Sequence, residues 1–215
     1  MPCPAKITFD DPQQAGSGVS APSAVEFFFS RDTSRSADDL RFPWLNNAYL
    51  APGECTDLVG AVSTAELPAG PYFVFAVSDP DERFPDLDRT NNTAMSEEVS
   101  LLPDLAAQPI DTFLDANGLH LWLTVCNRGL VRGSGVLDLA LSVDNTWSSD
   151  DQHLAVQTLT LRPGECSYMN PPVPLMAGTS PRFVTARLEP TAGEVDFNLA
   201  NNTSSTAAPI DLALP

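Results

Sequence analysis

The chain has 215 residues, and 43% of them are hydrophobic, which is enough to bury a core. Its 11 Lys and Arg residues against 28 Asp and Glu residues give a formal net charge of −17. This balance argues against nucleic acid as a partner and against docking on anionic lipid, because both need a basic face. No apolar run approaches the ~20 residues that cross a bilayer, so no membrane insertion is expected.

The predicted elements are short strands. Val25, Phe27 and Phe29 alternate with other residues in the first half of the chain, and residues 119–126 and 137–142 alternate apolar with mixed positions in the second half. This period of two is typical of a strand with one buried face. Turn signals such as Pro-Gly, Asn-Arg-Gly and Gly-Ser-Gly separate the runs, and no amphipathic helix of useful length is seen.

The two halves of the chain repeat one another. Residues 50–55 return at 161–166, residues 71–76 at 181–186, and Asn91-Asn92-Thr93 at 201–203, always 110 or 111 positions later. An ordered set of matches at a nearly constant offset indicates two copies of one unit. We therefore predict an all-β chain of two tandem immunoglobulin-like β-sandwiches, residues 1–102 and 103–215.

The second copy carries a family pattern. It opens with Pro-Asp-Leu at 103–105, continues with Val-Cys-Asn-Arg-Gly at 125–129, Leu-Ser-Val-Asp at 141–144 and Leu-Arg-Pro-Gly at 161–164, and closes with Asn201-Asn202. This ordered set resembles the CARDB family, the cell-adhesion-related domain found in bacteria. The first copy resembles the same family through its acidic loop and Asn91-Asn92, but it lacks the Pro-Asp-Leu opening. The resemblance implies a non-catalytic surface module of immunoglobulin-like fold, used in adhesion or as a spacer.

The four cysteines are Cys3, Cys55, Cys126 and Cys166, one pair in each half. In an immunoglobulin topology the second and fifth strands are neighbours, so we predict a Cys126–Cys166 bridge on the outer face of a sheet and, by analogy, a Cys3–Cys55 bridge. Such bridges imply an oxidising compartment, extracellular or at the cell surface. The alternative is four reduced, buried thiols. The N-terminus shows no signal peptide, so we expect either that a signal has been removed or that the protein is cytosolic.

An acidic loop is the candidate metal site. It carries five carboxylates within ten residues, and hard cations such as calcium bind carboxylate oxygens held by a loop. The alternative is a solvated hairpin loop that keeps the protein soluble. The candidate ligands are Asp79, Asp81, Glu82, Asp86 and Asp88.

Two further patterns favour turns over ligand sites. Asp32, Asp38 and Asp39 recur as Asp144, Asp150 and Asp151, and such residues commonly bond their own backbone. The Asn pairs begin N-x-T sequons, but we expect their amides to hold a turn before the last strand.

The first unit is expected to lack its N-terminal strand, because the counterpart of residues 103–109 would precede Met1. The tail of the chain resembles that strand, so the tail of one molecule could complete the first unit of the next and build a head-to-tail filament. Alternatively the tail finishes its own last strand, or the chain is a piece of a longer array. The tail residues are Ile210, Asp211, Leu212, Ala213 and Leu214.

Catalysis has little support. No G-x-S-x-G, H-E-x-x-H or Gly-rich phosphate motif occurs, and His120 and His153 have no nucleophile at an informative spacing. We expect a non-catalytic extracellular structural or adhesive protein whose partners are further copies of itself, other surface proteins or polysaccharide. The alternative is a cation-dependent ligand-binding or tethering module of a secreted or surface protein.

Overall fold

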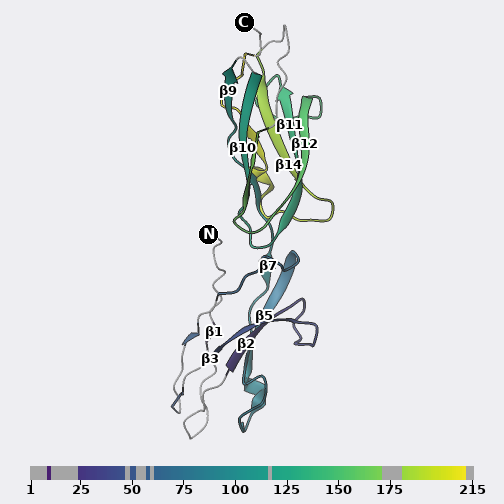
Figure 1. Ribbon diagram of the computed structural model, residues 1–215. Helices are drawn as coiled ribbons and strands as arrows, with labels where there is room; N and C mark the ends of the chain where they lie inside the picture. Colours follow the sequence, from purple (N-terminus) through teal and green to yellow (C-terminus); the bar gives the residue numbers. More distant parts are fainter. Residues whose placement is uncertain are drawn as a thin grey trace. The chain divides into compact units, whose positions relative to one another are not determined.

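The structure is a computed structural model, and it describes residues 9–10, 24–46, 49–51, 57–58, 61–115, 118–170 and 181–211. Within this part of the chain the regular elements are antiparallel strands and two three-residue 3-10 helices, η1 (Arg89–Asn91) and η2 (Leu199–Asn201) (Figure 1). The predicted all-β fold is therefore confirmed. No helix among the described residues is long and apolar enough to span a bilayer.

The chain divides into two compact units between Leu101 and Leu102, except that Thr64–Ala69 groups with the second unit.

The second unit is a sandwich of two sheets. One sheet has the order β13-β10-β8, with β9 also paired to β10, and the other has the order β12-β11-β14-β15. Figure 1 shows β9 and β10 in one layer and β11, β12 and β14 in the other. The strands are β8 (Leu105–Ala107), β9 (Asp111–Asp115), β10 (Gly118–Asn127), β11 (Gly133–Ser142), β12 (Gln152–Leu161), β13 (Cys166–Met169), β14 (Phe183–Pro190) and β15 (Thr203–Ser205).

The core of the second unit follows the predicted alternation. Leu121 in β10 is 0% exposed, whereas its neighbour Trp122 is 49% exposed and faces outward. Alternate residues of β10 meet alternate residues of β11 and β14 between the sheets, which is how two half-buried sheets share one core. The central members of this cluster are Leu105, Leu119, Leu121, Leu123, Val125, Leu137, Leu139, Leu141, Val184 and Leu188.

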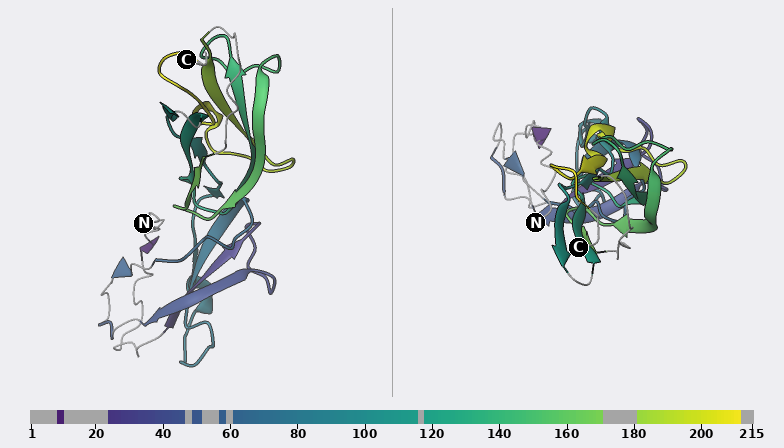
Figure 2. Two further views of the ribbon diagram at one scale, coloured as in Figure 1. Left: turned by 45° about the horizontal axis from the view of Figure 1, so that its top comes forward. Right: turned by 90° about the horizontal axis from the view of Figure 1, so that it is seen from above.

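The first unit repeats the second of these sheets. Its main sheet has the order β3-β2-β5-β6, with β7 paired to β5, and a two-stranded β1-β4 sheet lies in the same unit (Figure 2). In the two-stranded sheet Phe9 pairs with Leu58 and Asp10 pairs with Asp57. The strands are β1 (Phe9–Asp10), β2 (Ala24–Ser30), β3 (Leu40–Asn46), β4 (Asp57–Leu58), β5 (Gly70–Ser78), β6 (Thr93–Met95) and β7 (Val99–Leu101).

Burial in strand β2 departs from the predicted alternation. Phe28 and Phe29 are both buried, whereas Phe27 is only half-buried. The strand itself still alternates, because its pairing with β5 runs without a register shift from Val25 to Ser30, and Phe28 is buried because the outer face of the sheet is also covered. Phe28 packs with Phe75 in a separate apolar cluster, and the Arg35 guanidinium lies 4.3 Å from the centre of the Phe28 ring. Both faces of this strand therefore carry apolar contacts.

Candidate functional site

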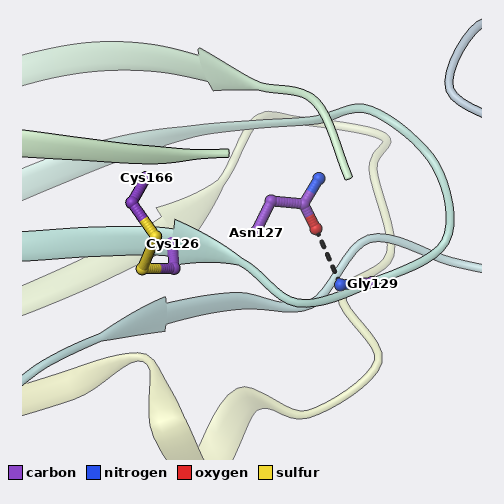
Figure 3. Close-up of a disulfide and its surroundings, with 4 residues drawn as sticks. All are labelled: Cys126, Asn127, Gly129 and Cys166. Atoms are coloured by element: carbon purple, nitrogen blue, oxygen red, sulfur yellow. Dashed lines mark hydrogen bonds between the residues drawn. A yellow bond between two sulfur atoms is a disulfide. The ribbon is translucent and has the colours of Figure 1, made fainter. Parts of the chain in front are cut away.

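Cys126 and Cys166 form a disulfide between β10 and β13 (Figure 3). The two residues lie directly opposite each other, with their Cα atoms 4.0 Å apart. The adjacent main-chain bond, from Asn127 N to Glu165 O at 2.9 Å, marks Cys126 and Cys166 as a non-hydrogen-bonded pair. Opposed residues of antiparallel strands approach most closely at such pairs.

The disulfide lies on the outer face of its sheet, as the parity of β10 predicts. Cys166 is exposed and Cys126 is half-buried. The predicted Cys126–Cys166 bridge is therefore confirmed. Cys3 and Cys55, the pair expected in the first unit, lie outside the described residues.

Asn127, the last residue of β10, is completely buried and uses its full hydrogen-bonding capacity. Its Nδ2 donates to the carbonyl oxygens of Val131 and Leu161, at 2.8 and 2.9 Å. Its Oδ1 accepts from the main-chain N–H groups of Gly129 and Asp104, at 2.9 and 3.2 Å. One side chain therefore joins the end of β10, the turn after it, the end of β12 and the opening of the unit.

The opening segment of the second unit, residues 103–105, is also held by the loop before β15. Phe197 N donates to the Pro103 carbonyl at 2.8 Å, and Asn201 Nδ2 donates to the Asp104 carboxylate at 2.8 Å. The main-chain N–H of Leu105 donates to Asp196 Oδ2 at 2.9 Å, and Asp196 is only 8% exposed. We call the three loop residues the strand clamp: Asp196, Phe197 and Asn201.

The turn after β10 leaves no room for a side chain at position 129. A Cβ atom on Gly129 would lie 2.4 Å from the nitrogen of Asp104 and 2.4 Å from the oxygen of Leu102. The flanking amides use this proximity, because Arg128 N bonds Asp104 O at 2.7 Å and Leu130 N bonds Leu102 O at 3.0 Å. Glycine is required here because the opening segment passes so close to the turn.

The motif fragments thus meet at one end of the second unit. Pro-Asp-Leu is the segment that is held, the Asn-x-Gly turn and Asn201 hold it, and Leu161 accepts a hydrogen bond from Asn127. Gly164 N in turn donates to the main-chain oxygen of Asn127 at 2.8 Å. These polar groups are engaged in fixing the fold, and the arrangement is a structural latch.

The acidic loop of the first unit is organised by its own carboxylates. Asp79 accepts from the N–H groups of Arg83 and Phe84, at 3.0 and 3.1 Å. Asp81 pairs with the Arg83 guanidinium at 2.7 Å, and both of these side chains are largely exposed. The loop needs left-handed backbone at two non-glycine residues, Asp79 (φ 47°) and Glu82 (φ 53°).

The last two acids of the loop act as turn and helix caps. Asp86 accepts from Asp88 N at 3.0 Å, and Asp88 accepts from Thr90 N at 3.0 Å at the start of η1. The N–H of Asp88, above all, and the side chain of Asn92 hold the pKa of Asp86 below its usual value. In the described part of the chain, no three His, Cys, Asp or Glu side chains gather as a metal site would need. The predicted calcium ligands share a loop but not a coordination site.

The Asp32 and Asp144 loops form matching turns. Asp32 Oδ1 accepts from Ser34 N at 2.7 Å, and Asp144 Oδ1 accepts from Thr146 N at 2.8 Å. Further along, Asp39 and Asp151 each cap a serine N–H at 2.8 Å. These bonds support the interpretation of both patterns as turn residues.

The Asn pairs hold the chain before the last strand, in part through the main chain. The carbonyl oxygens of Asn92 and Asn202 accept from Ser78 N and Leu188 N, at 2.9 and 2.8 Å. The side chain of Asn201 belongs to the strand clamp. The buried amide of Asn202 has no hydrogen-bond partner within the residues that the structure describes, so the expected role for its side chain is not seen.

The described part of the tail closes its own unit. Ile210 N donates to Arg182 O at 2.6 Å, and Arg182 N donates to Ile210 O at 2.9 Å. Ile210 also packs against the core of the second unit. Both main-chain groups of Ile210 are therefore paired within its own unit, and assembly through the tail stays a prediction. Asp211 adjoins this bridge, and Leu212, Ala213 and Leu214 lie outside the described residues.

Both histidines lie beside aromatic rings. His153 Nδ1 is 2.9 Å from Asp138 Oδ1, and the Trp147 ring packs edge-on against the imidazole. His120 lies in a row of rings with Phe113 and Trp122, whose centres are 6.0 and 6.4 Å from its own. Phe113 and His120 lie directly opposite each other on β9 and β10, a cross-strand pair on the surface of the sheet.

Sequence reasoning missed an acid-base pair that both units contain. Glu26 is only 3% exposed and bonds Arg41 across β2 and β3, while Asp138 meets His153 across β11 and β12. Glu26 stands 112 positions before Asp138, and Arg41 stands 112 positions before His153. Extending the repeat comparison to polar positions of the strands could have found this pair.

No protein-family model matches the chain, and no curated protein matches it in sequence. The resemblance to the CARDB family stays a prediction.

Proposed function

We propose that the protein is a non-catalytic structural or adhesive component of an extracellular surface, built from two immunoglobulin-like units. The observation that supports this most is the latch of the second unit. Three residues of the family pattern, Asn127, Gly129 and Asn201, hold or adjoin the opening segment, and Asp196 binds it as well. Their hydrogen-bonding capacity serves stability, which is what a spacer or an adhesive stalk needs.

The disulfide supports an extracellular location. Cys166 is exposed, and an accessible cross-strand disulfide persists in oxidising compartments but is reduced in the cytosol. Further copies of the chain, other surface proteins and surface polysaccharide are the proposed partners. Assembly through Ile210 is not part of the proposal, because that residue is paired within its own unit.

The location can be tested on the native protein. Cells are fractionated after thiols have been blocked with an alkylating reagent, and peptides that contain Cys126 and Cys166 are analysed by mass spectrometry. We expect the chain in the secreted or surface fraction with these two residues linked. Recovery in the cytosol with both thiols alkylated would contradict the proposal.

The second candidate, a cation-dependent tethering module, rests on the acidic loop. Since Asp79, Asp86 and Asp88 are used as main-chain caps, we expect the melting temperature to be unchanged, within about 1 °C, by millimolar calcium or by a chelator. A calcium-dependent rise of several degrees that Asp79→Asn abolishes would favour the tethering module instead.

A further inference from the structure

The loop of the first unit that corresponds to the strand clamp has the same local structure. Asp86 Oδ1 accepts from Asp88 N at 3.0 Å, as Asp196 Oδ1 accepts from Asn198 N at 2.9 Å. A 3-10 helix follows in both units, and its first turn is capped by Asp88 or by Asn198. Residues 84–92 and 194–202 are therefore equivalent at an offset of 110.

The first unit therefore contains residues that correspond to those of the strand clamp. Asp86 stands for Asp196, Leu87 for Phe197, and Asn91 for Asn201. The main-chain N–H of Leu87 stands in for that of Phe197, so the difference between Leu and Phe leaves the donor unchanged. The three groups of the first unit offer the same acceptor and the same two donors.

The two clamps differ in exposure. In the second unit Asp196 is buried by the segment it holds, with Oδ2 bonded to Leu105 N. In the first unit Asp86, Leu87 and Asn91 are all exposed. The lowered pKa of Asp86 keeps its carboxylate ionised at neutral pH, ready to accept a hydrogen bond.

We infer that the exposed clamp of the first unit, Asp86, Leu87 and Asn91, binds an extended Pro-Asp-Leu-type segment of another polypeptide. The residue before the Asp gives its carbonyl to Leu87 N–H, and the Asp carboxylate accepts from Asn91 Nδ2. The amide of the residue after the Asp donates to Asp86. These are the three bonds that residues 103–105 make in the second unit.

The tail of a second copy is a poorer occupant, although Asp211-Leu212 matches Asp104-Leu105 in type. Ile210 is bonded to Arg182 through both main-chain groups, and Asp211 follows it immediately. Asp104, by contrast, stands three residues after Leu101, the last residue of β7. Seating Asp211 in a clamp would require the Ile210 bridge to open. The tail of a second copy is therefore not the proposed occupant, and a Pro-Asp-Leu-type segment of a partner polypeptide is proposed in its place.

The test uses the full chain and a fluorescent peptide with the sequence Leu-Pro-Asp-Leu-Ala-Ala-Gln, capped at both ends, followed by fluorescence anisotropy at 150 mM salt. We expect saturable 1:1 binding. Asp86→Ala and Asn91→Ala should each weaken it at least about tenfold, because each removes a charge-assisted hydrogen bond. Replacing the peptide Asp by Ala should have an effect of similar size.

Asp81→Ala is the matched control, since it removes an exposed carboxylate from the same loop but not from the clamp. It should change the affinity less than about twofold, and circular dichroism should show that all variants are folded. Absence of saturation at millimolar peptide, or equal binding by Asp86→Ala and the unaltered chain, would overturn the inference. So would equal affinity for a peptide with the sequence of residues 210–215, which would identify a second copy as the occupant.

This inference adds an interaction surface to the proposed structural role. Failure of peptide binding would leave the extracellular location and the latch untouched, and these are tested separately above.

Discussion

Asn127→Ala should be among the most damaging single substitutions in the second unit. The truncation removes four hydrogen bonds, between 2.8 and 3.2 Å long, from a side chain that is 0% exposed. At a net value of about 1 kcal/mol for each bond, the loss is about 4 kcal/mol. Since a domain is stable by only about 5–15 kcal/mol, the unit should lose between about a quarter and four-fifths of its stability.

Urea denaturation measures this loss. Trp122 and Trp147 lie in the second unit and Trp44 in the first, so in a Trp44→Phe background the tryptophan fluorescence reports on the second unit. With a urea dependence of about 2 kcal/mol per molar, the transition midpoint of this unit should fall by about 2 M. Asn145→Ala is the matched control, because Asn145 lies exposed in the loop after β11, and its change should stay within about 0.5 kcal/mol.

A second variant tests the two N–H donors of the Asn127 amide separately from its oxygen acceptor. Asn127→Asp keeps an oxygen for the N–H groups of Asp104 and Gly129, but it places a carboxylate oxygen against the Val131 and Leu161 carbonyls. It should be at least as destabilising as Asn127→Ala, because a buried charge then faces two acceptors. A midpoint shift for Asn127→Ala no larger than that of Asn145→Ala would show that the latch does not stabilise the unit.

Three further predictions concern stability. Reducing the Cys126–Cys166 disulfide, or replacing both residues by Ser, should cost the second unit about 3–4 kcal/mol, given the sequence separation of 40 residues; melting curves with and without reductant check this, and equal melting temperatures would contradict it. Gly129→Ala should lower the melting temperature more than Gly193→Ala, since a Cβ at 193 meets no atom within 4 Å although its φ is +91°, and the reverse order would show that the close approach at 129 costs little. Burial raises the pKa of Tyr72, so the folded first unit holds its phenol proton more tightly than the unfolded chain does. Stability from this residue is complete below the unfolded pKa of about 10 and declines as the pH rises through it, a decline that Tyr72→Phe should reduce in alkaline unfolding measurements.

The parts of the fold that follow local rules could be predicted from the sequence. In β10, buried residues alternate with more exposed ones from Leu119 to Asn127, so the period of two in the sequence was sufficient to predict the buried face. In β2 it was not, because Phe75 on the neighbouring strand and Arg35 from the next loop also cover the outward Phe28. The alternation within one strand does not report what covers its outer face.

The latch shows the same limit at the level of the site. The motif fragments drew attention to Asn127 and Gly129, but the partners of Asn127 come from segments up to 34 positions away in sequence, and only the folded chain brings them together. The acidic loop shows the opposite difficulty. Carboxylates that could bind a cation also cap backbone N–H groups within a few residues, and Asp79 and Asp88 follow that second tendency.

For the tail, a short motif and the position in the repeat predict different roles. Asp-Leu-Ala at 211–213 matches the opening segment in composition, yet Ile210 pairs with Arg182 much as Val99 in β7 pairs with Tyr72 in β5. The position of Ile210 in the repeat, 111 residues after Val99, predicts its pairing with Arg182 better than the Asp-Leu-Ala motif does.

The outer-face disulfide also determines how the second unit responds to tension along the chain. A pull transmitted through Pro103 and Ile210 can straighten the polypeptide only outside the covalent loop from Cys126 to Cys166, a sequence separation of 40. At about 3.5 Å for each extended residue, oxidation withholds about 140 Å of contour length. Under the same tension, a unit with the disulfide formed would therefore extend less than a unit whose cysteines are reduced.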